Sequence, residues 1–395
     1  MLHAERILSA LIEHLKFSAI FASIPFEWNK EKGGFELKTR TNILIHKVRL
    51  RTALLYAASI LLQVVVTWKQ ATIFVKMHTI LFFSAMIMTC YTHHVFFTNR
   101  VEIVAYINAM ISFEKRRNAK EWRPKDLLGI ITKLLMRILS MSGIMLPVLY
   151  HFELIRLPCM PMHLGYFLLE NCPRGTFGKS LPATWSLEEI IGKVMIFTVS
   201  YFNWSFLMSG FAAHISIGLL LKGHCLRSYI LLFRKVMIGS SKRNANSHSS
   251  SKSIFFRELQ IMSANFRWIY ACYMNVGIVV SCMIVQIISL YSCFKLGSKL
   301  PVPMLIFYCM AAVDCGFVIL VVYGGLAEVY KVSKCLNKEL KGKVDVQVNR
   351  WFRTFFKSCQ IIKVHFGETS CIDEMTPLNF EDFVIQQTVS LLLLK

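Results

Sequence analysis

Charged residues are scarce in this chain. Lys, Arg, Asp and Glu together make up 17% of its 395 residues, against about 25% in an ordinary soluble domain. Hydrophobic residues make up 55%, and the mean hydropathy is +0.49. The apolar residues also come in long blocks of roughly 20, the length that spans a hydrocarbon core of ~30 Å. The composition therefore excludes an ordinary soluble domain and predicts a membrane protein.

Acidic residues are the scarcer of the two charge classes. The chain has 23 Asp and Glu against 45 Lys and Arg, a net charge of +22. The basic residues lie between the apolar blocks, where they hold cytosolic loops inside and attract anionic lipid headgroups. We therefore expect this charge to face the lipid bilayer and not nucleic acid.

Motifs of enzymes and cofactor sites are lacking. The sequence contains no phosphate-binding loop, no catalytic-triad spacing and no cluster of metal ligands at useful spacing. Glu188 and Glu189 stand at the entry to an apolar block, and we interpret them as boundary residues. We expect no enzymatic activity, no cofactor and no metal.

A cleavable signal peptide is lacking as well. Charged side chains such as Glu13 and Lys16 interrupt the apolar residues of segment 1–25, so no continuous apolar core of a signal peptide is present. Leu11 and Leu15 belong to an apolar pattern at helical spacing. This pattern predicts an amphipathic helix at the inner membrane face.

The apolar blocks predict an all-α polytopic protein with seven membrane-spanning helices. The segments on one side of these blocks carry 34 Lys and Arg, and those on the other side carry 7. This bias places the N-terminus in the cytosol and the C-terminus outside the cell, opposite to G-protein-coupled receptors. The predicted spans are residues 52–68, 71–92, 127–150, 193–217, 268–293, 302–324 and 379–394.

These spans divide the chain into four parts. Residues 1–51 form a cytosolic N-terminal segment, and 52–324 hold the first six spans with their cytosolic helical extensions. Residues 325–378 form a cytosolic helical loop for anchoring or oligomerisation, in which 346–363 have the pattern of an amphipathic helix. Residues 379–395 form the terminal span.

The layout and two local segments resemble the arthropod gustatory and odorant receptor superfamily. Segment 24–28 (IPFEW) is similar to an early Pro-Phe signature of that superfamily. Segments 372–378 (IDEMTPL) and 382–389 (DFVIQQTV) resemble gustatory-receptor-like chemoreceptors of springtails. Typical gustatory receptors carry Thr-Tyr, five apolar residues and Gln-Phe in the terminal span, whereas this chain has QQTVSLLLL at 386–394.

The resemblance implies a function. It implies a ligand-gated, non-selective cation channel that assembles as a homo- or hetero-tetramer in the plasma membrane of a chemosensory neuron. The terminal spans would line the pore, and a small tastant or odorant would bind toward the outside among spans two, three, four and six. Two alternatives are a multi-pass transporter, against which we find no internal repeat, and a metabotropic receptor of inverted topology.

The terminal span offers candidate pore residues. Gln387, Ser390, Leu391 and Leu394 share one helix face by their spacing. Polar residues followed by an apolar ring are typical of a dewetting gate, and ordinary packing between helices is the alternative.

An acid near the middle of the sixth span is the second candidate. A charged residue at this depth is costly, so a specific role is expected. Asp314 and Arg137 lie at similar distances from the inner ends of their spans. We predict a buried ion pair between them. There are two alternatives to this ion pair. Asp314 would face a ligand, or Arg137 would reach to the inner membrane interface.

Aromatic and polar side chains at one depth in the outer half suit a small organic ligand. Aromatic core packing is the alternative. The candidate pocket residues are Lys76, His78, Tyr201, Asn203, Trp204, Phe307 and Tyr308. In the outer loop, Cys159 and Cys172 are candidates for a disulfide in an oxidising compartment.

Overall fold

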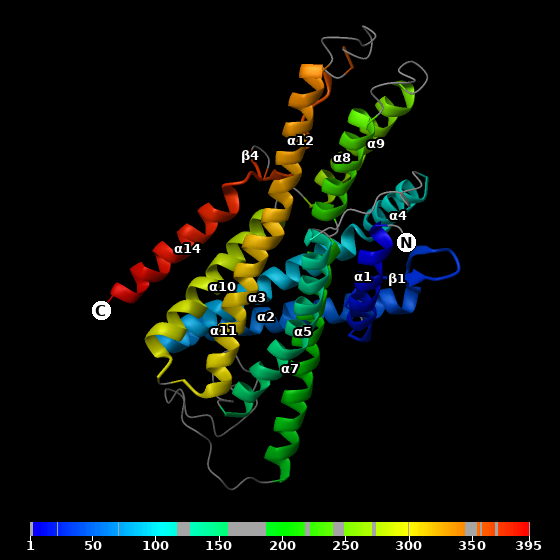
Figure 1. Cartoon of the computed structure of the whole chain (residues 1–395). Helices are drawn as coiled ribbons and strands as arrows, with labels where there is room; N and C mark the ends of the chain where they lie inside the picture. The colour runs from blue at the N-terminus through cyan, green and yellow to red at the C-terminus, as the bar shows by residue number, and fades with distance from the viewer. Residues whose placement is uncertain are drawn as a thin grey trace.

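Helices account for most of the residues that the computed structural model describes (Figure 1). The described residues are 3–21, 23–69, 71–116, 127–156, 187–217, 222–239, 249–270, 274–298, 300–343, 354–355, 358–367 and 370–394. The helices are α1 (His3–Ile20), α2 (Arg40–Thr67), α3 (Ile73–Thr98), α4 (Arg100–Arg116), α5 (Leu127–Arg156), α7 (Leu187–His214), α8 (Lys222–Gly239), α9 (Ser249–Tyr270), α10 (Met274–Leu296), α11 (Val302–Phe317), α12 (Tyr323–Lys343) and α14 (Thr376–Leu393).

Six helical segments within the described residues are long and apolar enough to cross a membrane. They coincide with the first six predicted spans, although α10 begins at Met274 and not at 268. The predicted seventh span falls in α14, which is helical but is not among the six. Polar side chains such as Asp382, Gln386 and Gln387 interrupt its apolar residues. The six segments are Arg40–Val66, Ile73–Thr98, Lys133–Phe152, Val194–Ile217, Asn275–Leu296 and Val302–Leu340.

The sixth span continues without a break into the next helix. A turn of π-helix, η3 (Val318–Val322), joins α11 to α12. The predicted boundary between residues 324 and 325 therefore lies inside a continuous helical segment. A π-turn inserts a wider turn into an α-helix and is frequent at functional sites.

A β-hairpin interrupts the helices near the N-terminus, which an all-α prediction did not include. Strands β1 (Phe26–Asn29) and β2 (Gly34–Leu37) pair antiparallel across a turn in which Gly33 has a positive φ of 59°. The side chain of Asn108 on α4 binds the backbone of Phe35 at both N–H and C=O, each at 2.8 Å. The hairpin is thereby held against α4.

A second short hairpin follows α12. Strand β3 (His365–Phe366) pairs with β4 (Ser370–Cys371). The chain before β3 is not helical from Cys359 to Val364, so the helix predicted over 346–363 is wrong in this described portion. The backbone N–H of Ile362 donates instead to the Ser333 hydroxyl on α12 at 2.8 Å, and the Ile362 side chain is buried.

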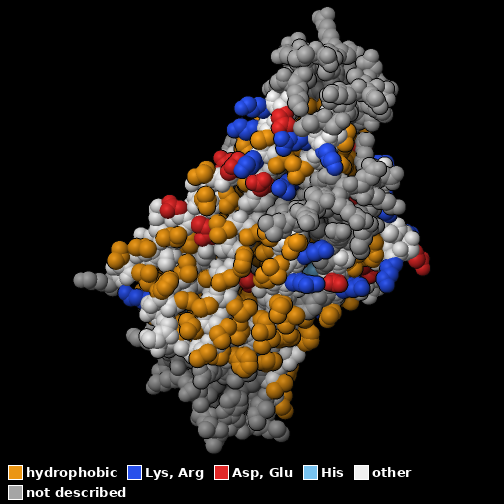
Figure 2. All heavy atoms as spheres, in the orientation of Figure 1, with side chains coloured by type: hydrophobic (Ala, Val, Ile, Leu, Met, Phe, Trp, Pro, Cys, Tyr) orange, Lys and Arg blue, Asp and Glu red, His pale blue; other side chains and the backbone are white. Residues whose placement is uncertain are grey.

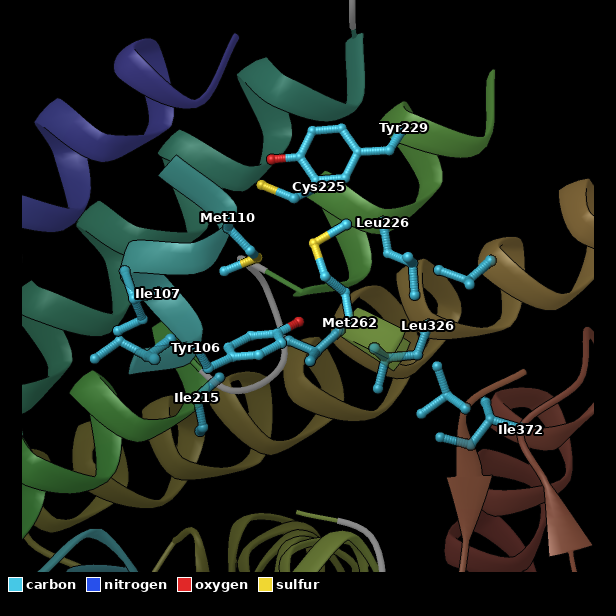
Figure 3. Close-up of a cluster of buried hydrophobic side chains, with 14 of the residues drawn as sticks. Tyr106, Ile107, Met110, Ile215, Cys225, Leu226, Tyr229, Met262, Leu326 and Ile372 are labelled. Atoms are coloured by element: carbon cyan, nitrogen blue, oxygen red, sulfur yellow. The ribbon is translucent and has the colours of Figure 1, made fainter. Parts of the chain in front are cut away.

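The apolar core at one end of the molecule joins segments that are distant in sequence (Figure 3). Met110 on α4, Tyr229 on α8, Met262 on α9 and Leu326 on α12 belong to it, and Ile372 reaches it from beyond β4. On α8, Arg234 forms an ion pair with Glu339 of α12, with Nε donating at 2.9 Å. These contacts fasten the helical extensions to the bundle.

Charge separates along the molecule. In Figure 2, Lys, Arg, Asp and Glu side chains gather toward the end where α12 projects, whereas the lower part of the same face is mainly hydrophobic. Such a division matches a protein whose apolar part lies in lipid and whose charged end lies in water.

Candidate functional site

A partly open cavity of about 110 Å³ lies among the helices of the bundle. Five helical segments wall it: α3, α5, α7, α10, and α11 with the start of η3. An engineered apolar cavity of ~150 Å³ binds benzene, so this volume suits a compact organic molecule. The lining is almost wholly apolar, with a few hydroxyl groups and one acid.

Aromatic rings form one part of the lining. Phe82 on α3 is buried, and its ring centroid lies 4.9 Å from Tyr150, 5.3 Å from Trp204 and 5.3 Å from Phe307. Phe82 and Phe307 are nearly parallel, at 6°, while Trp204 meets Phe82 edge-on at 88°. Aromatic pairs at these separations add about 0.5–1.5 kcal/mol beyond their burial, which keeps this wall rigid.

The acid lies further along α11. Asp314 lines the cavity together with Ser142 of α5, Ser281 of α10 and Val318 of η3. The hydroxyl of Ser142 donates a hydrogen bond to the carboxyl group of Asp314. At a rise of 1.5 Å per residue, Asp314 stands about 10 Å along the helix from Phe307. The cavity therefore has an aromatic end and a carboxyl end.

Two of the predicted pocket residues, Trp204 and Phe307, line this cavity. Two others lie directly behind its aromatic wall: the Tyr308 hydroxyl and Nδ1 of His78 form a hydrogen bond, and both side chains are buried. The His78 ring lies 4.6 Å from Phe82. These two residues therefore support the lining without forming part of it.

The remaining three predicted pocket residues lie away from the cavity. Lys76 is in the first turn of α3, where its ammonium lies 5.3 Å from the Trp68 ring centroid. Tyr201 packs against His151, with ring centroids 5.2 Å apart. Asn203 is buried on α7 but is not among the lining residues. The prediction used the expected depth of each residue in the membrane but not the helix face on which its side chain lies.

The predicted ion pair is absent. No ion pair within the described residues joins Arg137 to Asp314, and Arg137 is exposed on α5. At 3.6 residues per turn, Arg137 points about 180° away from Leu146, which lines the cavity. The two side chains leave their helices in different directions. Asp314 faces the cavity, as the alternative interpretation expected.

Several lining residues were missed from sequence. Phe82, Ser142 and Tyr150 belong to this group. For Ser142 and Tyr150 the signal was the spacing on α5, where cavity-lining residues recur every three or four positions as on one helix face. The lining residues of α5 are Leu139, Ser142, Gly143, Leu146, Pro147 and Tyr150.

The candidate pore residues lie on a helix that is only partly covered. Val384 and Thr388 are the buried side chains in the middle of α14, which packs against α10 and η3. Gln387 and Ser390 are exposed, and Leu391 is half-buried. Leu394, one residue past the helix end, is 66% exposed. Within one chain, α14 therefore leaves most of its surface for other contacts.

One polar contact connects α14 to the bundle beside the cavity. Gln286 on α10 donates from Nε2 to the Glu381 carboxylate at 3.0 and 3.3 Å. A Cβ added at Gly316 would lie 3.2 Å from that Nε2 atom, so this contact lies against the helix that also carries Asp314.

The predicted disulfide between Cys159 and Cys172 stays a prediction. Cys159 and Cys172 lie outside the described residues. Cys293 of α10 and Cys309 of α11 instead approach each other, with Sγ atoms 3.6 Å apart. Within the described residues, no group of three or more His, Cys, Asp or Glu side chains could hold a metal ion.

Comparisons with known proteins place this architecture. No protein-family model matches the chain, and no curated protein sequence matches it. This chain is similar to the structure of the insect olfactory receptor OR5 from Machilis hrabei in complex with eugenol, with a TM-score of 0.68 and 9% sequence identity. The match covers 98% of this chain and 100% of that chain. A second structure of that receptor gives a TM-score of 0.65 at 9% identity, over 100% and 99% of the two chains. This chain therefore has the all-α membrane fold of an insect olfactory receptor.

Proposed function

We propose that this protein is a chemosensory receptor that acts as a ligand-gated, non-selective cation channel. The observation that carries the proposal is the apolar cavity among α3, α5, α7, α10 and α11, in a fold whose similar structure was determined with eugenol bound. An apolar cavity with a few polar groups is the usual form of a small-molecule site. A small organic tastant or odorant is the proposed ligand.

The proposed pore helix is α14. Its polar residues make it a poor lipid-facing span, yet its surface also exposes Phe383, Ile385 and Leu393. A helix with both kinds of exposed residue suits a position between neighbouring subunits and a water-filled path. Gln387 and Ser390 would then face water, and Leu391 and Leu394 would form the apolar constriction.

Ligand binding is proposed to reach the pore through the contacts beside the cavity. Val318 lines the cavity and begins η3, which packs against α14. Gln286 holds Glu381 of α14 next to the same helix. Expansion of the cavity would therefore push on elements that touch the terminal helix.

The assembly and location follow from the same proposal. We propose a homo- or hetero-tetramer in the plasma membrane of a chemosensory neuron, with a cytosolic N-terminus and seven spans. Kinship with the gustatory-receptor-like proteins of springtails rests on segments 372–378 and 382–389 near the C-terminus. Residues 325–378 are proposed to take part in subunit contacts.

Recording of currents from cells that express the chain tests the ligand site. We expect a panel of compact organic molecules to evoke a cation current. Ala311→Leu places extra methyl groups in the cavity and should abolish that current, because Ala311 is a buried lining residue. Val313→Leu is the matched control, since Val313 is 54% exposed on the same helix. Equal responses from both variants at equal surface expression would contradict the cavity as the ligand site.

Two further measurements test the pore. Imaging of purified particles should reveal a four-fold ring with α14 at its axis, and a monodisperse monomer would contradict the channel. Leu394→Ala should raise the basal current, because it shortens an apolar side chain at the proposed constriction. An unchanged basal current would remove Leu394 from the gate.

A further inference from the structure

We propose that the cavity selects a small organic amine, bound as its ammonium ion by the carboxylate of Asp314. The inference rests on the proposed function, since it names the ligand class of the same cavity. It comes from one contrast in the lining: a single carboxyl group among otherwise apolar residues and hydroxyl groups.

The environment of Asp314 supplies no counter-ion within the described residues. No ion pair to Asp314 exists within the part of the chain that the structure describes, and the nearest candidate by depth, Arg137, is on the opposite face of its helix. Ser142 supplies one neutral hydrogen bond. A carboxylate in an apolar, intramembrane setting is costly unless a cation pairs with it. The described residues therefore include a costly group for which they supply no cationic partner.

An ammonium group satisfies this carboxylate. A hydrogen bond between two charged groups is about twice as strong as a neutral one, and the low dielectric of the cavity strengthens it further. The ammonium carries three N–H donors. Besides Asp314, the hydroxyl oxygens of Ser142, Ser281 and Thr89 in the lining are acceptors.

The other end of the cavity suits the hydrocarbon part of such a ligand. Phe82, Trp204 and Phe307 form the aromatic end, about 10 Å along α11 from the acid. An apolar body there removes hydrocarbon from water. A neutral ligand of the same size would fill this end equally well but would leave Asp314 without a counter-ion. The cavity should therefore distinguish an amine from its neutral analogue.

Binding to the purified full-length protein tests the inference. The probes are isoamylamine and isoamyl alcohol, which share a carbon skeleton and differ in the charged group. We expect the amine to bind more tightly than the alcohol. Asp314→Asn, which keeps the shape of the side chain, should weaken amine binding on the order of 30-fold or more, as removal of one partner of a buried charge pair does. It should change alcohol binding by less than about 3-fold.

Two variants guard against a loss of folding. Asp314→Glu keeps the charge and should keep the preference for the amine. Glu102→Gln removes an exposed acid on α4 and should leave both affinities unchanged. Elution as an unchanged particle confirms that each variant is folded.

The outcomes separate this inference from the proposed function. Equal affinities for amine and alcohol, or an Asp314→Asn variant that still prefers the amine, would overturn the role of Asp314 and leave the cavity as a ligand site. Failure of both probes to bind the folded protein would also overturn the inference. Amine binding that evokes no current in cells would support Asp314 and contradict the channel function.

Discussion

Among the described glycines, Gly210 has the closest approach to a side chain of another helix, and it gives the first prediction. Gly210 of α7 faces the ring of His93 on α3, and a Cβ added at Gly210 would lie 2.0 Å from Cε1 and 2.2 Å from Nε2 of that ring. Ordinary contact begins near 3.4 Å, so Gly210→Ala requires a shift of about 1.4 Å. We expect this single methyl group to destabilise the protein.

The His93 ring has little freedom to move aside. Its Nε2 lies 3.1 Å from the carbonyl oxygen of Phe206 and 3.3 Å from that of Leu207. Carbonyl oxygens only accept, so Nε2 carries the proton and donates. The ring also stacks on Phe206 at 4.3 Å and lies 5.5 Å from His46. Displacement of the ring would break these contacts.

The cost follows from two terms. Overpacking of a filled core costs about 1–3 kcal/mol, and a buried donor left without its acceptor costs about 1–3 kcal/mol. We therefore expect Gly210→Ala to lower the free energy of unfolding by about 2–6 kcal/mol, a large part of the ~5–15 kcal/mol that a native protein has. In detergent, the variant should lose its monodisperse elution at a lower temperature.

A control and a double variant make the test specific. Gly192→Ala, in the same helix, meets nothing within 4 Å, and Ala there should stabilise the helix by up to about 1 kcal/mol. His93→Ala combined with Gly210→Ala removes the clash, so the combined loss should be smaller than the sum of the single losses. Additivity of the two substitutions within about 0.5 kcal/mol would refute the argument.

Three other groups give further predictions. Burial lowers the pKa of His14 on α1 from 6.5 to about 4. Because the folded protein holds the neutral form, its stability should be full above pH 6.5 and should fall toward pH 4 by up to about 1.4 kcal/mol per pH unit. Measurement of thermal stability against pH tests this. Tyr229→Phe removes the hydroxyl that donates to buried Glu114 at 2.8 Å. The variant protein should be less stable by about 1–3 kcal/mol in thermal denaturation, and an unchanged melting point would contradict this prediction. Mild oxidation should join Cys293 to Cys309, whose Sγ atoms are 3.6 Å apart, and mass spectrometry of the digested protein should detect the linked peptides.

The helices were predictable because membrane insertion imposes a simple rule. A span must present about 20 apolar residues to lipid, and six such segments stand out in this sequence and in the structure. The hairpin of β1 and β2 was not predictable in this way. It depends on Asn108, which is 73 positions from Phe35 in the sequence. No local sequence pattern predicts a contact over that separation.

The site was predictable in depth but not in direction. Trp204 and Phe307 were predicted to lie in the outer half of their spans, and both line the cavity. Tyr201 lies only three positions from Trp204 but packs against His151. Depth follows from counting residues at 1.5 Å each. Helix rotation follows from packing against neighbouring helices, which a membrane sequence encodes weakly because lipid and core are both apolar.

The same reasoning explains why Asp314 stands out. An apolar residue in a membrane helix is compatible with lipid, with another helix or with a ligand, so its type alone decides nothing. A carboxyl group is compatible with few settings, because lipid and an apolar core both penalise it. In this structure it lines a cavity, where Ser142 contacts it, and it forms no ion pair within the described residues. The residue that is most costly to place in the membrane is therefore the one that best indicates what the cavity binds.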